Sequence, residues 1–190
     1  MIKKILILFV AILTLSSCSY NSLVDKEEHV TEQWSQVENV YQRRADLIPN
    51  LVNTVKGYAK HEKSTLTAVV EARAKATSTT IDASKLNAQS IQRFQAAQDG
   101  LSSALSKLMV VVERYPDLKA NQNFMDLQAQ LEGTENRIAV ERKKFNKAVK
   151  DYNTLVRKFP SNISANLFGF DKKDYFHATE GSDKAPTVQF

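Results

Sequence analysis

Apolar residues recur at steps of three and four along the first part of the chain. The series comprises Val30, Trp34, Val37, Tyr41, Ile48, Leu51, Val55 and Tyr58, with Arg44 or Ala45 in its one gap. This spacing is typical of a helix with a single apolar seam. The phase survives Pro49 and continues through Leu66 and Val69, so the pattern predicts one helix over residues 25–76, kinked at Pro49.

Two later stretches carry the same period and predict helices over residues 85–114 and 119–159. The first contains Ile91, Phe94, Leu101, Leu105, Leu108, Val112 and Tyr115, with only Gln98 off type. The second contains Phe124, Leu127, Leu131, Thr134, Ile138, Phe145, Val149, Tyr152, Leu155 and Phe159. Small hydroxyl residues predict a loop over 76–84, and Pro116 and Pro160 end the two helices.

Helices with one apolar seam are not stable alone and must bury those seams against one another. The predicted fold class is therefore all-α, an elongated antiparallel helical bundle with long heptad-patterned helices. It is of the four-helix type if the first helix breaks at Pro49. At 1.5 Å per residue the 85–114 helix descends about 45 Å, which predicts the corner at residues 115–121 beside Pro49. Residues 131–135 should then lie level with residues 58–62.

This arrangement leaves the stripe of Val30, Trp34, Val37 and Tyr41 uncovered. An apolar stripe of that length does not stay bare in water. Either the helix folds back at Pro49 as a fourth antiparallel member, or the stripe is an interface with a second copy or an envelope protein. The unbroken phase favours the interface.

The N-terminus has the order of a lipoprotein signal. Lys3 and Lys4 precede an apolar run over residues 5–15, too short to span a membrane, which ends in Leu-Ser-Ser-Cys18. This ending resembles the bacterial lipobox, so residues 1–17 are expected to be a signal peptide and residues 18–24 an acylated link, with Cys18 as the lipid attachment site. The alternative is an uncleaved anchor with an incidental cysteine. In both cases the bundle is extracytoplasmic, in the bacterial cell envelope, and Ser19 favours the outer membrane if the source is Gram-negative.

Composition narrows the possible functions. The 190 residues carry a formal charge of +5, which falls to +3 without the signal peptide and gives no basis for nucleic-acid binding. A single cysteine excludes an internal disulfide. His29, His61 and His177 lack the spacing of a di-metal bundle, and no catalytic motif is present. We therefore expect no metal, no cofactor and no enzymatic activity.

Polar residues near the two proline corners form the remaining candidate site. Its members are Arg43, Arg44, Asp46, Asp117 and Lys119. They would suit an anionic partner, although salt bridges and helix capping explain the same residues. Residues 161–176 are expected to pack on the end of the bundle and residues 177–190 to form a disordered tail.

Two motifs give the chain a resemblance to a known family. They are Arg44-Ala-Asp-Leu-Ile-Pro-Asn-Leu-Val52 with Lys56-Gly-Tyr-Ala-Lys-His-Glu62, and Tyr115-Pro-Asp-Leu-Lys-Ala-Asn121. Together with Glu71-Ala-Arg73, Leu127-Gln128, Thr134-Glu135 and Arg137-Ile-Ala139, they resemble the LemA family. The resemblance implies a membrane-tethered extracytoplasmic four-helix bundle with no established catalytic activity. Relatives often keep an uncleaved N-terminal helix, from which this lipobox departs, and the ending Tyr175-Phe176-His177 also differs.

The leading hypothesis is a membrane-anchored interaction or scaffold module of the envelope, bound to membrane lipid through acylated Cys18. The alternative is a small-ligand sensor or enzyme that uses the polar corner.

Overall fold

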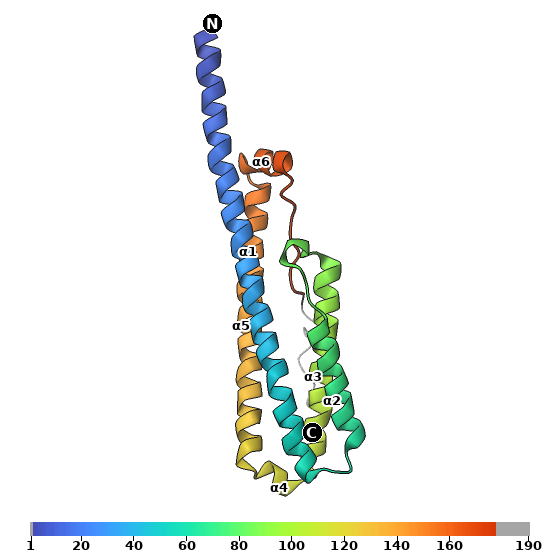
Figure 1. Ribbon diagram of the computed structural model, residues 1–190. Coiled ribbons are helices and arrows are strands. Elements are labelled where there is room, and N and C mark those ends of the chain that lie inside the picture. Colours follow the sequence, from blue (N-terminus) through green and yellow to red (C-terminus); the bar gives the residue numbers. More distant parts are fainter. Residues whose placement is uncertain (1, 178–190) are drawn as a thin grey trace, which may run out of the picture.

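The computed structural model describes residues 2–177, with side chains for residues 19–83 and 85–177. Four long helices run antiparallel along one axis (Figure 1): α1 (Ile2–Tyr58), α2 (Lys63–Ser78), α3 (Ala88–Val112) and α5 (Gln122–Arg157). Shorter elements connect or cap them: a 3-10 turn at Ala83–Lys85, α4 (Pro116–Lys119) and α6 (Ser161–Phe168). The described residues contain no strand, which confirms the all-α bundle.

The chain reverses after Tyr58 and not at Pro49. Pro49 lies inside α1, which ends at Tyr58, and α2 begins at Lys63 after a turn in which the Glu62 amide donates to the Ala59 carbonyl at 3.1 Å. The predicted single helix over 25–76 is therefore wrong. The expected break before Asp25 is also absent, because α1 is already helical from Ile2 and includes the predicted link.

The corner between α3 and α5 meets this same turn. Asn121 Nδ2 donates to the Tyr58 hydroxyl at 2.9 Å, and the Glu62 carboxylate accepts from Arg114 Nη2 at 2.9 Å and from the Tyr115 hydroxyl at 3.1 Å. The prediction that residues 115–121 lie beside Pro49 is wrong by the about 13 Å of helix between Pro49 and Tyr58. We call this end of the bundle, residues 58–63 and 113–122, the tip.

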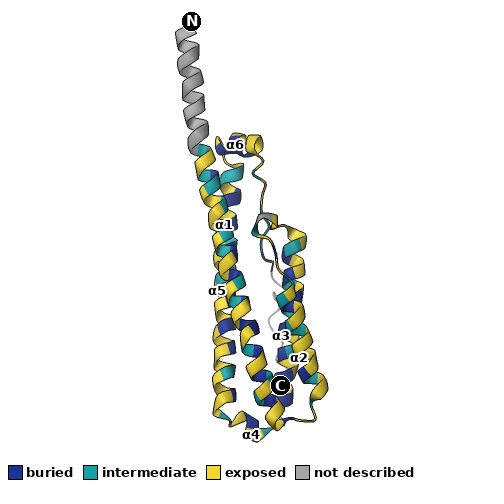
Figure 2. Cartoon of the chain, in the orientation of Figure 1, coloured by how far each residue is buried: buried dark blue, intermediate teal, exposed yellow. Residues whose placement is uncertain are grey.

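Burial follows the heptad seams (Figure 2) and divides into two apolar clusters. The cluster nearer α6 centres on Trp34, whose ring lies edge-on to Phe94 at 5.2 Å and to Phe145 at 5.5 Å. The cluster nearer the tip is mostly aliphatic and includes Leu51 and Leu108, with Phe124 as its aromatic member. Helix α5 packs along α1 and covers the stripe of Val30, Trp34, Val37 and Tyr41 that was predicted to be exposed.

Candidate functional site

The proposed lipid attachment site lies within the first helix. The backbone of Cys18 is part of α1, while its side chain is outside the described residues. Within the part of the chain that the structure describes in full, no helix is long and apolar enough to cross a membrane. The described residues also hold no group of three or more His, Cys, Asp or Glu side chains placed to bind a metal ion.

The four residues proposed as an interface lie in the chain's own core. Val30, Trp34 and Val37 are fully buried and Tyr41 is 5% exposed. All four belong to the cluster that α3, α5 and Phe176 complete, and the Trp34 ring stacks on Phe176 at 5.8 Å. The interface interpretation of this stripe is therefore corrected: its partner is the rest of the same bundle.

The five residues of the polar corner do not converge. Asp117 and Lys119 lie in α4 at the tip, whereas Arg44 lies further along α1 and contacts Glu135. This contact also corrects the predicted register. Residues 131–135 were expected level with residues 58–62, whereas Glu135 lies level with Arg44.

Two of the corner charges have neighbouring partners. Lys119 Nζ lies 2.6 Å from Glu113 Oε2, and Asp46 Oδ1 accepts from Gln42 Nε2 at 2.7 Å. Arg43 and Asp117 are exposed. The corner consequently offers no shared pocket for an anionic ligand.

Arg44 instead forms a buried polar layer between the two apolar clusters. Its side chain is 1% exposed, and one guanidinium nitrogen donates to Glu135 Oε1 at 2.8 Å and Ser102 Oγ at 3.0 Å. The other donates to Gln98 Oε1 at 2.6 Å and the Gln98 carbonyl at 3.3 Å. Gln98 Nε2 continues the network to the Ala76 carbonyl at 3.2 Å, which ties α1, α2, α3 and α5 together at one level.

The sequence carries a signal for this layer. Arg44 fills the gap in the first heptad series, and Gln98 is the off-type position of the second. Two polar residues at seam positions of facing helices satisfy each other best when they meet at the same level. Such a layer penalises any other register, because a shifted helix would bury Arg44 against apolar side chains.

Pro49 has a compensating partner on α2. Proline has no backbone N–H, so the Ala45 carbonyl loses its normal helical donor. Arg73 Nε occupies that position and donates to the Ala45 oxygen at 2.7 Å. The freed carbonyl is therefore capped from α2, and not by the charged residues of α1 that precede the proline.

A cavity of about 60 Å³ adjoins the polar layer. Its lining carries several hydroxyl groups and one carboxyl group: Glu38, Tyr41, Gln42, Ala45, Ala76, Thr77, Thr79, Thr80, Phe94 and Gln98. Burial is the largest influence on the Glu38 carboxyl and raises its pKa. The Trp34 indole N–H finds no acceptor at hydrogen-bonding distance. This volume holds one or two waters and no metabolite.

The segment after α6 turns back along the bundle as an extended strap, residues 170–177. Asn153 exchanges two hydrogen bonds with the backbone of Lys173, at 2.8 and 2.9 Å. Asn146 does the same with Phe176, at 3.0 and 2.9 Å. The Tyr152 hydroxyl donates to the Asp171 carbonyl at 2.9 Å. The pKa of that hydroxyl is raised, and burial is the largest cause of the rise.

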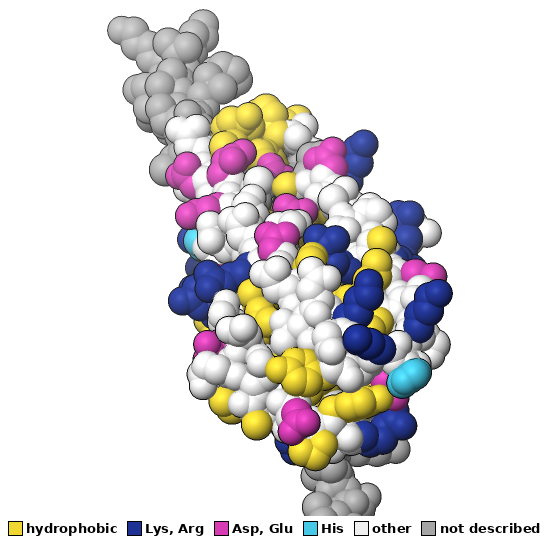
Figure 3. All heavy atoms as spheres, turned by 60° about the horizontal axis from the view of Figure 1, so that its bottom comes forward, with side chains coloured by type: hydrophobic (Ala, Val, Ile, Leu, Met, Phe, Trp, Pro, Cys, Tyr) yellow, Lys and Arg dark blue, Asp and Glu magenta, His cyan; other side chains and the backbone are white. Residues whose placement is uncertain are grey.

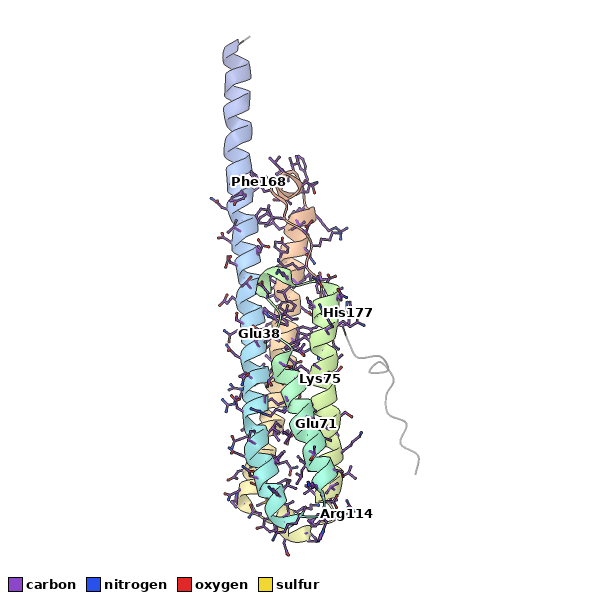
Figure 4. All side chains as sticks on the ribbon, turned by 45° about the vertical axis from the view of Figure 1, so that its right-hand side comes forward. Glu38, Glu71, Lys75, Arg114, Phe168 and His177 are labelled. Carbon is purple, nitrogen blue, oxygen red and sulfur yellow. The ribbon has the colours of Figure 1, made fainter. Side chains whose placement is uncertain are left out.

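The strap joins α5 to α3. The His177 carbonyl accepts from Gln95 of α3 at 3.1 Å and from Arg142 of α5 at 3.0 Å, and Figure 4 labels His177 beside the bundle. Seven helical residues between Asn146 and Asn153 rise about 10.5 Å, close to the about 10 Å that three extended residues span. His177 is held by these contacts and is not part of a disordered tail as predicted, while residues 178–190 of that tail lie outside the described residues.

The chain has relatives among known bacterial proteins. Residues 33–190 match the sequence profile of the LemA family. The chain is 27% identical to the magnetosome protein MamQ of Magnetospirillum gryphiswaldense, over 92% of this chain and 70% of the relative. It is 26% identical to MamQ 2 of Paramagnetospirillum magneticum, over 86% of this chain and 66% of that protein.

A third relative carries the family's own name. Protein LemA of Metamycoplasma hominis is 21% identical over 84% of this chain and 69% of its own length. The chain thus spans about two thirds of the length of these relatives. Because the family profile covers residues 33–190, the chain belongs to the LemA family.

Proposed function

We propose that this LemA-family chain is a lipoprotein of the bacterial cell envelope, tethered through acylated Cys18, whose extracytoplasmic bundle serves as a non-catalytic interaction or scaffold module. The observation that carries the proposal is the continuity of α1. This helix runs from Cys18 into the core without a break, so no flexible link separates the proposed attachment site from the bundle. A tether at Cys18 therefore fixes the orientation of the whole bundle.

The continuity of α1 gives the module a defined reach. From Tyr20 to Tyr58 the helix rises about 57 Å, so the tip stands that far from the anchor. Figure 4 labels Phe168 near the anchored end and Arg114 at the tip. A rigid spacer of this length suits a protein that presents a contact surface at a set distance from a membrane.

Pairing of the terminal nitrogens of Arg44 supports a non-catalytic role. Both donate to Gln98, Ser102 or Glu135, while Arg44 Nε has no hydrogen-bond partner. The cavity beside Glu38 and Gln98 is water-sized. The alternative small-ligand sensor or enzyme loses its support, because the residues of the polar corner are separated along the bundle. The outer membrane stays the favoured location, on the basis of Ser19.

Acyl labelling tests the tether. Cells that express the full chain are grown with an alkyne analogue of palmitate, and the protein is followed in membrane and soluble fractions. The wild-type chain should carry the label and fractionate with membranes, whereas Cys18→Ser should lose the label. A matched Ser17→Ala variant should keep it, because the neighbouring position is not the acyl acceptor. An unlabelled wild-type chain would refute the lipoprotein assignment.

Crosslinking tests the scaffold clause separately. A photoreactive amino acid replaces exposed residues at the tip, such as Lys60 or Arg114, in the anchored protein. Discrete crosslinked species of higher mass are expected at these positions and not at exposed Lys107 on α3. If membranes give only the uncrosslinked chain from all positions, the interaction role is wrong while the anchor stands.

A further inference from the structure

Helix α6 has an inverted distribution of side chains. It lies across the end of the bundle opposite the tip (Figure 1) and contacts α1 and α5. The residues it buries there are Ser161, Ser164 and Ala165, which are at most 8% exposed. Its large apolar residues point outward instead: Ile163 is 59% exposed and Leu167 is 74% exposed. A helix that meets only water buries the opposite set. The outward face of α6 therefore requires an apolar or interfacial environment.

The exposed face extends beyond the N-terminal end of α6 and reaches the last residue of this helix. Phe159, just before α6, is 75% exposed, and Phe168 at its end is 54% exposed. Figure 3 shows hydrophobic side chains gathered at this end of the molecule. We call Phe159, Ile163, Leu167 and Phe168 the α6 patch.

The patch sits directly beside the point of anchorage. The ring of Tyr20 lies edge-on to Phe168 at 4.9 Å and to Phe170 at 5.7 Å. Tyr20 follows Cys18 by two residues, a rise of about 3 Å along α1. A bilayer that holds acyl chains on Cys18 must therefore begin at the level of α6. The same holds if the apolar run over residues 5–15 is retained as the anchor.

We propose that α6 lies in the lipid–water interface of the anchoring membrane, with the α6 patch inserted among the headgroups and upper acyl chains. This inference rests on the proposed membrane tether and adds a second contact to it. Tyrosine and phenylalanine beside the insertion point suit an interface, where an apolar ring meets lipid and a hydroxyl meets water.

The surrounding charges fit the same surface. Exposed Arg157 and Lys158 precede the patch and exposed Lys172 follows it, so cations flank the apolar side chains where lipid phosphates would lie. Exposed acids also lie at this end of the bundle, with Asp171 just after α6 and Asp25 and Glu28 on α1 close to Tyr20. A second copy of the chain is a weaker occupant, since four side chains offer well under the about 800 Å² per partner that a stable complex buries.

Site-specific labelling of the full chain in vesicles tests the proposal. The acylated protein is purified from membranes and reconstituted in phosphatidylcholine–phosphatidylglycerol vesicles, where Cys18, the only native cysteine, is blocked by its lipid. Leu167→Cys then carries an environment-sensitive NBD fluorophore. The matched control is Val110→Cys on α3 near the tip, which is 71% exposed against 74% for Leu167. Both positions are on the surface, so neither label disturbs the core.

Lipids with nitroxide groups near the headgroup supply the readout. The label at position 167 should emit at shorter wavelength and be quenched at least about twofold more than the label at position 110. Equal quenching at the two positions overturns the proposal. A shortened wavelength without quenching also overturns it, because protein and not lipid would then cover the patch.

Flotation of the same sample separates this proposal from the tether. If the chain floats with vesicles while position 167 is not quenched, the α6 contact is wrong and the tether stands. If the chain does not float, the proposed tether fails, and the α6 contact falls with it.

Discussion

The pairing of Pro49 with Arg73 predicts a measurable energetic coupling between α1 and α2. In the native chain the Ala45 carbonyl accepts a hydrogen bond from Arg73 Nε in place of one from a helical N–H. Ala45 is 3% exposed, so water reaches its carbonyl poorly once Arg73 is removed. Pro49→Ala restores a backbone N–H at the position from which a helix normally serves that carbonyl.

The magnitudes follow from the burial of that carbonyl. A hydrogen bond from a charged donor contributes about 1.5–3 kcal/mol, and an orphaned buried carbonyl costs about 1–3 kcal/mol. Arg73→Ala should therefore destabilise the Pro49 chain by about 2–3 kcal/mol. In the Pro49→Ala background the same change should cost only about 1 kcal/mol, since the restored amide serves the carbonyl. The expected coupling is about 1–2 kcal/mol.

Urea denaturation of the four chains, followed by circular dichroism, measures this double-mutant cycle. Arg137→Ala, an exposed arginine on α5, is the matched control and should change stability by less than about 0.5 kcal/mol in either background. The reasoning is refuted if Arg73→Ala costs the same with and without Pro49, because Arg73 would then act independently of the missing amide.

Three further predictions concern other parts of the bundle. Asn153→Ala removes the two hydrogen bonds between Asn153 and the strap, so it should lower stability by about 1–2 kcal/mol and speed hydrogen exchange at Lys173. Exposed Asn123→Ala should do neither. Gly133→Ala should add about 1 kcal/mol to the free energy of unfolding and so raise the midpoint of thermal unfolding, because alanine favours the helix and its Cβ would meet no neighbouring atom. An unchanged or lower midpoint would contradict this. The pKa of Glu38 is raised in the fold, so its ionisation weakens stability as pH rises through the folded pKa. Glu38→Gln should therefore stabilise the protein more at pH 7 than at pH 4 in denaturant titrations, and a pH-independent difference would count against this assignment.

The heptad spacing was sufficient to predict the fold class, because amphipathic seams of this length have no other stable arrangement in water. The reversal at residues 59–62 escaped prediction for a physical reason. Leu66 and Val69 stay in phase with Val55, so the pattern carries no sign of the four-residue turn between them. Pro49 is the stronger helix breaker by propensity, yet Arg73 on α2 makes it tolerable inside α1.

The misplaced turn propagated into the candidate sites. The predicted helix continued past Tyr58, which placed residues 115–121 beside Pro49 and brought the residues of the polar corner together. The same prediction left the Trp34 stripe without a partner. Once the chain reverses at the tip, the register shifts and α3 and α5 cover that stripe. The off-type heptad positions Arg44 and Gln98 identify the correct register, because a buried cation needs the acceptor that the facing seam supplies.

The strap and α6 could not be found from periodicity. Asn146 and Asn153 resemble ordinary surface positions of α5, and their role depends on an extended partner that has no helical period. For α6, eight residues are too few to define a face, and its exposed leucine and phenylalanine become informative only beside Tyr20.

Intact-mass spectrometry of the protein extracted from its native membrane tests the central claim most directly. The account predicts a mature chain that begins at Cys18 and carries the mass of a diacylglycerol group, with an N-linked acyl chain where the host adds one. A chain that retains residues 1–17 with an unmodified Cys18 thiol would contradict it.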